Sequence, residues 1–234
     1  MSTLSGGPNI VTNGLIFYLD ATNTKSYPRN GNTWYDLCIG RNNGTLVNGP
    51  TFNSDNGGSI LFNGNKYVII PSSSFILGTS SCTLNVWTRI SSSSSNYALC
   101  LSCGIGSSSG LLYCGYVSGV QYGTSNTLGG GGYGQNIGTG VYPDNKWHYI
   151  TVVSNGGNPS LVSVFIDGSF KISANIPLNI TSNIVKIGAG DDGVPTSPSY
   201  VLNGDVSSAQ IYNRPLNDVE ILQNYNATRS RFGL

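Results

Sequence analysis

Hydrophobic and polar residues alternate along residues 15–20 and 83–90, as they do in β-strands with one face in a core. The set expected to face the core is Leu15, Phe17, Leu19, Leu84, Val86, Thr88 and Ile90. Short runs rich in β-branched and aromatic residues predict strands at 15–20, 59–62, 67–70, 82–90, 97–102, 111–117, 147–154, 161–166, 169–176, 184–187 and 202–212. About a dozen strands fit two stacked sheets better than one open sheet.

The last predicted strand ends at a proline. Val206, Ala209 and Ile211 form its apolar face, and the offset between 206 and 209 predicts a β-bulge. Pro215 has no backbone N–H to donate to a sheet, so the strand is expected to end before it.

A helix is predicted after Pro215. Asn217 can cap its N-terminus, with Glu220 three residues later as in a capping box. Larger side chains recur at helical spacing and are predicted to cover the edge of a sheet: Leu216, Val219, Leu222 and Tyr225.

Turn signals separate the predicted strands. Asp167-Gly168 predicts a hairpin, because Asp-Gly supplies the positive φ angles that a two-residue primed turn needs. Segments at 91–96, 104–110 and 128–136 are rich in Ser or Gly and lie between strand-like runs. We interpret them as loops within one domain.

Composition and charge narrow the classes of partner. The 234-residue chain has a size that a single β-sandwich reaches, and only 9% of its residues are charged. Eleven Lys and Arg against ten Asp and Glu leave no basic surface for nucleic acid or for an anionic membrane. The N-terminal MSTLSGGPNIVTNG has neither the basic start nor the apolar core of a signal peptide, so we expect synthesis and folding in a cytoplasm.

Several segments resemble one family. GLIFYLDA at 14–21, NKWHYITVV at 145–153, the Asp-Gly hairpin and the C-terminal strand and helix are similar to the LamG-like jelly roll of the concanavalin A-like lectin and glucanase superfamily. The closing QNYNATRSRFGL looks most like LamG-like domains in structural proteins of tailed bacteriophages. The resemblance implies an all-β, two-sheet antiparallel jelly-roll sandwich with a short C-terminal helix, formed by residues 14–234 after an N-terminal arm at 1–13.

Residues for catalysis are scarce. The related glucanases use paired carboxylates, whereas Glu220 is the only glutamate here and Asp191-Asp192 lies in a Gly- and Pro-rich segment. His148, the only histidine, lies in the Trp-His strand motif, which indicates a structural role. A Ser-His-Asp or Cys-His site around His148 stays open as an alternative, although no nucleophile elbow in strand-turn-helix context accompanies it. We expect no enzymatic activity.

The cysteines form an odd set, namely Cys38, Cys82, Cys100, Cys103 and Cys114. Without an export signal, free buried thiols are expected. Cys100-x-x-Cys103 with Cys114 superficially resembles a zinc knuckle, whose fourth ligand would come from Cys82, Cys38 or His148. YALCLSCG is typical of a strand, however, whereas a knuckle needs a tight turn containing glycine.

Calcium is the cofactor that the resemblance implies, because many members of this superfamily hold one between the first and last strands. Ser207 stands where an acidic ligand is common, and Asp20 and Asp205 are the candidate replacements. No cofactor is required by the sequence, and a structural calcium at Asp20 and Asp205 is a hypothesis.

Sugar binding needs an aromatic platform with amide or hydroxyl neighbours, because a pyranose has an apolar face and a rim of hydroxyls. Strand alternation places Trp87, Asn85 and Arg89 on the face directed away from the core. These three residues are therefore a candidate platform for a sugar. In the alternative interpretation, a loop or a neighbouring subunit covers Trp87.

Tyrosines provide a second set of candidates, within a region rich in Gly, Ser and Asn: Tyr113, Tyr116, Tyr122, Tyr133 and Tyr142. This mixture pairs rigid amphipathic contacts with adaptable hydrogen bonding, as in antibody paratopes. Alternatively, these tyrosines shield hairpin loops.

We therefore expect a non-enzymatic structural protein of a phage virion, as a capsid decoration, a head fibre or part of a tail fibre. Its expected partners are capsid or tail proteins, glycans of the host surface and copies of itself. The alternative is a carbohydrate-binding lectin module that is not tied to a virion.

Overall fold

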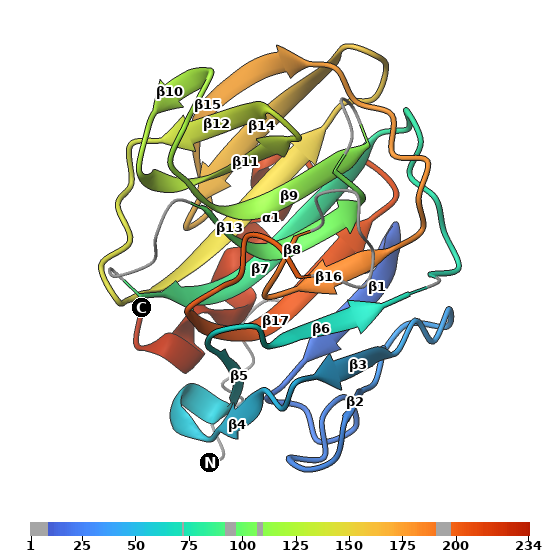
Figure 1. The fold of residues 1–234 in the computed structure, drawn as a ribbon, viewed down its shortest axis with the longest axis vertical. Coiled ribbons are helices and arrows are strands. Elements are labelled where there is room, and N and C mark those ends of the chain that lie inside the picture. Colours follow the sequence, from blue (N-terminus) through green and yellow to red (C-terminus); the bar gives the residue numbers. More distant parts are fainter. Residues whose placement is uncertain (1–8, 72, 92–96, 107–109, 191–197) are drawn as a thin grey trace, which may run out of the picture.

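The computed structural model describes residues 9–71, 73–91, 97–106, 110–190 and 198–234. Within them the strands form two stacked sheets, and one short α-helix follows the last strand (Figure 1), which confirms the predicted jelly-roll sandwich. The strands are β1 (Leu15–Asp20), β2 (Thr33–Trp34), β3 (Gly44–Val47), β4 (Thr51–Asn53), β5 (Ser59–Phe62), β6 (Tyr67–Ile70), β7 (Cys82–Ile90), β8 (Tyr97–Gly104), β9 (Leu111–Val117), β10 (Tyr122–Thr124), β11 (Thr127–Gly132), β12 (Gln135–Thr139), β13 (Trp147–Ser154), β14 (Ser160–Ile166), β15 (Ser169–Ile176), β16 (Val185–Ile187) and β17 (Gly204–Tyr212). The helices are the 3-10 helices η1 (Asp55–Gly57) and η2 (Arg229–Phe232) and the α-helix α1 (Asp218–Thr228).

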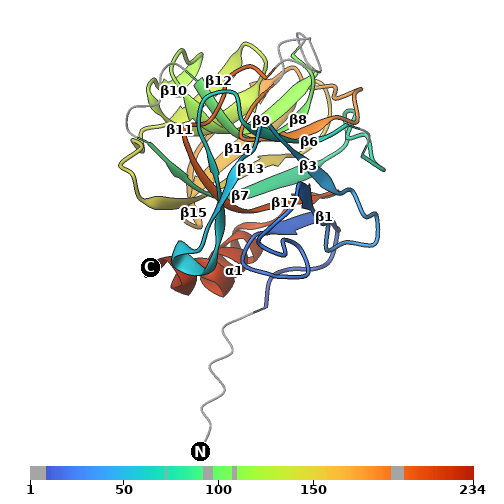
Figure 2. The same cartoon turned by 60° about the horizontal axis from the view of Figure 1, so that its bottom comes forward.

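The two sheets differ in what covers their outer faces. The eight-stranded sheet has the order β15-β14-β13-β7-β17-β5-β4, with β1 also paired to β17. The nine-stranded sheet has the order β10-β12-β11-β9-β8-β16-β6-β3-β2, and its pairs are antiparallel except β10 with β12. Figure 2 shows the nine-stranded sheet, the eight-stranded sheet and α1 as successive layers. The helix therefore covers only the eight-stranded sheet.

Pairing of β1 with β17 joins the two ends of the described chain, from Leu15 opposite Tyr212 to Asp20 opposite Ser208. The predicted bulge in β17 is confirmed by a register shift between Val206 and Ser208 against β7. A second irregularity, between Leu15 and Phe17, turns Leu15 away from the inter-sheet core and toward Val11 and Leu216. The expectation that Leu15 faces that core is therefore wrong.

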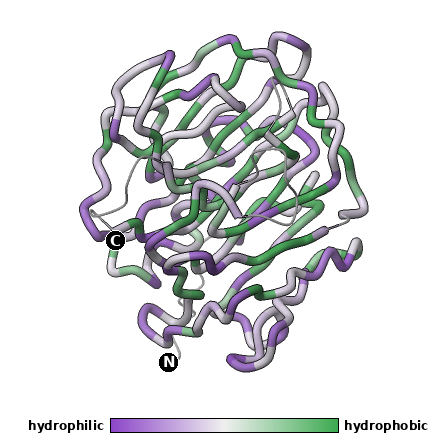
Figure 3. Tube along the Cα trace, in the orientation of Figure 1, coloured by the Kyte–Doolittle hydropathy of each residue, from purple (hydrophilic) through white to green (hydrophobic). Residues whose placement is uncertain are grey.

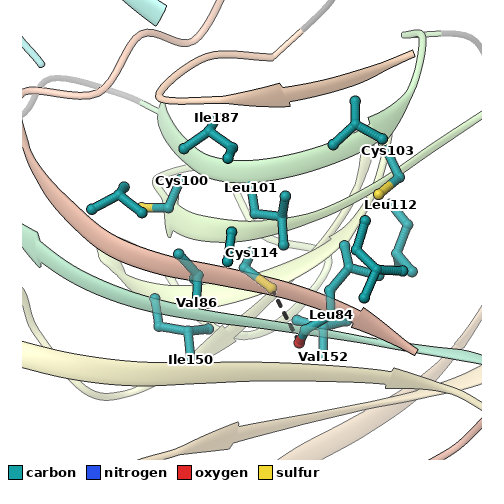
Figure 4. Packing of buried hydrophobic residues seen from close by; sticks show 14 of the residues in the cluster. Leu84, Val86, Cys100, Leu101, Cys103, Leu112, Cys114, Ile150, Val152 and Ile187 are labelled. Atoms are coloured by element: carbon teal, nitrogen blue, oxygen red, sulfur yellow. Dashed lines mark hydrogen bonds between the residues drawn. The ribbon is translucent and has the colours of Figure 1, made fainter. Parts of the chain in front are cut away.

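The core lies between the sheets, where the hydrophobic strands face one another (Figure 3). The predicted core face of β7 is confirmed, because Leu84, Val86 and Ile90 are buried there and the Thr88 hydroxyl lies 3.3 Å from Cys100 Sγ. Three cysteines point into this aliphatic core (Figure 4), and Cys114 Sγ donates to the carbonyl oxygen of Leu84.

All five cysteines are free, and four of them are buried while Cys38 is half-buried. The expected free thiols are thus confirmed. Burial raises the pKa of Cys82 and of Cys100 to about 12, so these thiols stay protonated and apolar in character. The described residues contain no group of three or more His, Cys, Asp or Glu that could hold a metal ion, which speaks against the zinc knuckle.

The Asp167-Gly168 hairpin is confirmed, with φ angles of 54° and 76° and Ile166 paired to Ser169. Residues 128–136 are a different case, because they form strands β11 and β12 instead of the predicted loop. A Cβ on Gly130 would lie 2.4 Å from Val152 Cγ2, so glycine lets β11 lie close to the facing sheet. Parts of the other two predicted loops, 92–96 and 107–109, lie outside the described residues, as do Asp191-Asp192 and residues 1–8 of the expected arm.

Six short strands lie outside the predicted strands, namely β2, β3, β4, β10, β11 and β12. The predicted limits otherwise shift by one or two residues, since β8 extends to Gly104, β14 begins at Ser160, β16 begins at Val185 and β17 begins at Gly204.

Helix α1 has the predicted capping box, in which the Asn217 side chain accepts from Glu220 N and the Glu220 carboxylate accepts from Asn217 N. Its predicted apolar face is confirmed at Leu216, which is buried, and at Tyr225, which stacks on Trp87, but it is wrong at Val219 and Leu222, which are 75% and 46% exposed. The helix also buries Ile221, Asn224 and Thr228. No helix among the described residues is long and apolar enough to cross a bilayer.

Candidate functional site

The outer face of the eight-stranded sheet is closed by the C-terminal segment. Trp87 is 1% exposed, its ring centroid lies 4.2 Å from that of Phe232, and its Nε1 donates to Thr228 Oγ1 at 2.7 Å. Asn85 is fully buried beside Gln210. Trp87 and Asn85 therefore form no exposed sugar platform, because α1 and η2 cover Trp87 and Asn85 is buried. Strand alternation identified the non-core face, but it could not show that the chain's own end packs on it.

The remaining member of that set, Arg89, forms an ion pair with Asp205 at 2.8 Å and lies over the ring of Trp147. Asp205 also accepts a hydrogen bond from the Ser59 hydroxyl at 3.0 Å. These contacts hold the start of β17 against β5 and β7.

The calcium hypothesis rested on Asp20 and Asp205, which lie in separate ion pairs. Asp20 is paired with Arg231 at 3.0 Å and accepts from the Tyr18 hydroxyl at 2.8 Å, while Asp205 is paired with Arg89. A calcium ion needs several oxygens with uncompensated negative charge. Each carboxylate is instead neutralised by an arginine, so the two residues do not fit a shared calcium ion.

The outer face of the nine-stranded sheet has a hollow of about 250 Å³. We call it the tyrosine hollow, and its lining residues are Tyr97, Leu99, Leu111, Tyr113, Tyr133, Gly134, Asn136 and Tyr200. They come from β8, β9, β12, the turn between β11 and β12, and the segment before β17. Two of the predicted tyrosines, Tyr113 and Tyr133, are therefore brought together here.

The floor of the tyrosine hollow depends on strand register. Gly131 on β11 is paired with Tyr113 on one side and with Asn136 on the other. Because glycine has no side chain, the Tyr113 hydroxyl reaches across β11 and donates to Asn136 Oδ1. Tyr113 is 2% and Asn136 6% exposed, which places both at the bottom of the hollow.

Asn136 also holds one wall of the hollow. Its Nδ2 donates to the carbonyl oxygen of Gly119 at 2.6 Å and to the Tyr97 hydroxyl at 3.1 Å. The rings of Tyr97 and Tyr200 meet edge to face with their centroids 5.5 Å apart, and Tyr133 is 37% exposed. Aromatic surface therefore surrounds a polar floor.

The other predicted tyrosines do not line the tyrosine hollow. Tyr116 packs into the inter-sheet core, Tyr122 packs against that core with its hydroxyl 3.4 Å from the carbonyl oxygen of Asn175, and Tyr142 is 60% exposed. Sequence reasoning missed Tyr97, Asn136 and Tyr200. Leu111 shares the face of Tyr113 through strand periodicity, but no local pattern marks Tyr200, which approaches the sheet from a distant segment.

His148 has a structural position, as expected. Its Nδ1 lies 2.7 Å from Asp167 Oδ2 and its Nε2 3.2 Å from Asp144 Oδ1, while Asp167 Oδ1 accepts from Tyr149 N. Burial alone would lower the pKa of His148, but the hydrogen bonds and charges of Asp167 and Asp144 raise it above its ordinary value. Asp167 thus connects the β14–β15 turn to β13, and Asp144 connects the segment before β13 to the same histidine.

A family profile described as "Concanavalin A-like lectin/glucanases superfamily" matches residues 62–222, which is most of the chain and includes β7 to β17. The chain belongs to this superfamily. A search of curated proteins found no match.

Solved structures of this fold include domain 4 of the GH43 extracellular arabinanase AbnA from Geobacillus stearothermophilus, in complex with arabinotriose (TM-score 0.65, 15% identity, covering 90% of this chain and 98% of that one). Trypanosoma rangeli sialidase in complex with sialic acid is similar at TM-score 0.64 and 18% identity, covering 96% and 35%. The binding domain of Paraclostridial Mosquitocidal Protein 1 is similar at TM-score 0.62 and 16% identity, covering 92% and 52%. The chain thus corresponds to one whole arabinanase domain but to about a third or half of the other two chains. These similarities show the fold alone, a lectin-like sandwich that chains of glycosidases share with binding domains.

Proposed function

We propose that this protein is a non-enzymatic carbohydrate-binding protein whose ligand site is the tyrosine hollow. The observation that carries the proposal is the composition of the lining, with four tyrosines and two leucines around the buried Asn136. A sugar ring stacks its apolar face on aromatic side chains and directs its hydroxyls to a few fixed polar atoms. The hollow offers both kinds of surface.

The absence of enzymatic activity is supported by the state of Glu220. Its carboxylate pairs with Arg214 at 2.6 Å and closes the capping box of α1. The ion pair holds the pKa of Glu220 below its ordinary value, whereas the general acid of a glycosidase needs a raised pKa. Glu220 is also the only glutamate in the sequence.

We further propose that the protein is a structural component of a phage virion, as a capsid decoration, a head fibre or part of a tail fibre. Support comes from the resemblance of QNYNATRSRFGL to such proteins and from a surface poor in charge. Capsid or tail proteins would be its partners, and the tyrosine hollow would attach the particle to host-surface glycans.

A second candidate is a lectin module that is not tied to a virion. It is favoured by the match to a complete arabinanase domain, of which 98% is covered, because that domain belongs to an extracellular enzyme.

Three experiments test the proposal. Retention on a panel of immobilised oligosaccharides should be lost in Tyr133→Ala and kept in Tyr142→Ala, a tyrosine outside the hollow that is 60% exposed. The same oligosaccharides should release no reducing sugar, and measurable hydrolysis would contradict the non-enzymatic assignment.

Immunogold labelling of intact phage particles should locate the chain on the capsid or tail. Unlabelled particles would favour the second candidate.

A further inference from the structure

The hydrogen bonds beneath the tyrosine hollow fix where its protons lie. The Gly119 carbonyl oxygen can only accept, and it lies 2.6 Å from one end of the Asn136 amide. That end must be the nitrogen, because an oxygen there would leave two acceptors in contact. The Asn136 oxygen then faces Tyr113, so the Tyr113 hydroxyl must donate its only proton to Asn136.

The neighbouring hydrogen-bond donors also have their protons in hydrogen bonds within the protein. The two Nδ2 protons of Asn136 go to Gly119 O and to the Tyr97 hydroxyl, and its backbone N–H goes to Gln121 Oε1 at 3.0 Å. The Tyr97 hydroxyl donates to Gly119 O at 3.1 Å and accepts from Gly119 N at 3.2 Å. Burial also raises the pKa of Tyr113, so its proton stays in place at neutral pH.

We propose that the floor of the tyrosine hollow presents only hydrogen-bond acceptors, Tyr113 Oη and Asn136 Oδ1, and therefore selects uncharged saccharides. A sugar hydroxyl that reaches the floor donates its proton to one of these oxygens. A carboxylate or sulfate has no proton to give, and it would lose its hydration against acceptors of the same partial charge. No charged residue is among the described residues that line the hollow, so none would compensate an anion.

This inference rests on the proposed function and adds the class of ligand. It also separates the chain from a sialic acid-binding protein, although the sialidase shares its fold. Asn136 is a positioning residue, because it accepts the hydrogen bond that occupies the Tyr113 proton. The Tyr113 oxygen is the atom that contacts the ligand.

The test uses pairs of saccharides in which one member carries a carboxylate and the other is neutral. Methyl-esterified oligogalacturonides are compared with their free acids, and lactose with its sialylated form, on the full chain. The neutral member should bind about tenfold more tightly than the acid. This preference should persist in 0.5 M salt, because salt screens long-range repulsion but does not replace a missing hydrogen-bond donor. Tyr113→Phe removes the acceptor oxygen and keeps the ring, so the neutral sugars should lose about tenfold in affinity. Tyr142→Phe is the matched control, since Tyr142 lies outside the hollow.

The outcomes separate this inference from the proposed function. Equal or tighter binding of the acids, or unchanged neutral binding in a folded Tyr113→Phe, would overturn the inference and leave the sugar-binding function standing. Failure of every saccharide to bind would overturn both.

Discussion

Trp87 illustrates what one side chain does in this sandwich. Its ring lies between β7 and the C-terminal segment and contacts the rings of Tyr149, Tyr225 and Phe232. Its indole N–H is satisfied by Thr228, and the Thr228 hydroxyl in turn donates to Asn224 O. A residue that looked suited to a ligand is therefore part of a second, smaller core.

We predict that Trp87→Ala lowers the free energy of unfolding by about 3–5 kcal/mol, the range for truncating a fully buried aromatic side chain. Urea denaturation measures it through the midpoint at constant slope. Tyr142→Ala is the control and should change stability by less than about 0.5 kcal/mol, as exposed positions do. A change below about 1 kcal/mol in Trp87→Ala would mean that α1 and η2 do not cover the ring.

His148 makes stability depend on pH. Its pKa is raised above its ordinary value in the folded chain, so its contribution is complete below about pH 6.5. The contribution is lost as the pH rises through the folded pKa, because the neutral imidazole no longer attracts Asp167 and Asp144. Thermal unfolding should therefore move to lower temperature between pH 6 and pH 8.5 in the wild type. His148→Gln should remove most of this slope, and a variant with the wild-type slope would contradict the assignment.

At the level of elements, periodicity predicted the long strands well and failed where packing overrides it. The limits of β7, β9 and β13 are those predicted, because each is a run rich in β-branched and aromatic residues. Four of the six residues of β11 are glycines, which give no strand pattern, yet β11 is an interior strand of the nine-stranded sheet. For α1 the caps were predictable from local chemistry, whereas the buried face was set by the polar groups of the sheet beneath it.

The same limit applies to the candidate site. Composition drew attention to Tyr113 and Tyr133, but the sequence could not separate them from Tyr116, which faces the core. Tyr200 and Asn136 belong to the site only through tertiary contacts, since their positions depend on the segment before β17 and on the register of β12 with β11.

Substitution of Gly131 tests whether β11 must lack side chains. A Cβ there would lie 2.3 Å from the Gln135 carbonyl oxygen, at a φ of 134°. Gly131→Ala should cost clearly more than the about 1–2 kcal/mol of an unfavourable φ alone, and it should weaken saccharide binding by displacing Tyr113 from Asn136. Gly49→Ala is the control, because Gly49 also has a positive φ but no atom within 4 Å of its would-be Cβ. Equal destabilisation of the two variants would show that β11 tolerates a side chain.

For the whole molecule, the pairing of β1 with β17 makes the last segment indispensable. β17 lies between β7 on one edge and β1 and β5 on the other, and α1 covers the sheet beside it. Deleting residues 204–234 would expose the cores on both faces of the eight-stranded sheet, so we predict insoluble protein. Recovery of a soluble truncated chain with a cooperative thermal transition would contradict this closure.

The helix closes one outer face of the sandwich, and the proposed function assigns ligand binding to the other face. The most direct test is a crystal structure of the chain with the oligosaccharide that it retains best. We predict a sugar ring in the tyrosine hollow, stacked on Tyr133 or Tyr200, with a hydroxyl within hydrogen-bonding distance of Tyr113. A sugar bound elsewhere on the chain, with the tyrosine hollow empty, would contradict the account.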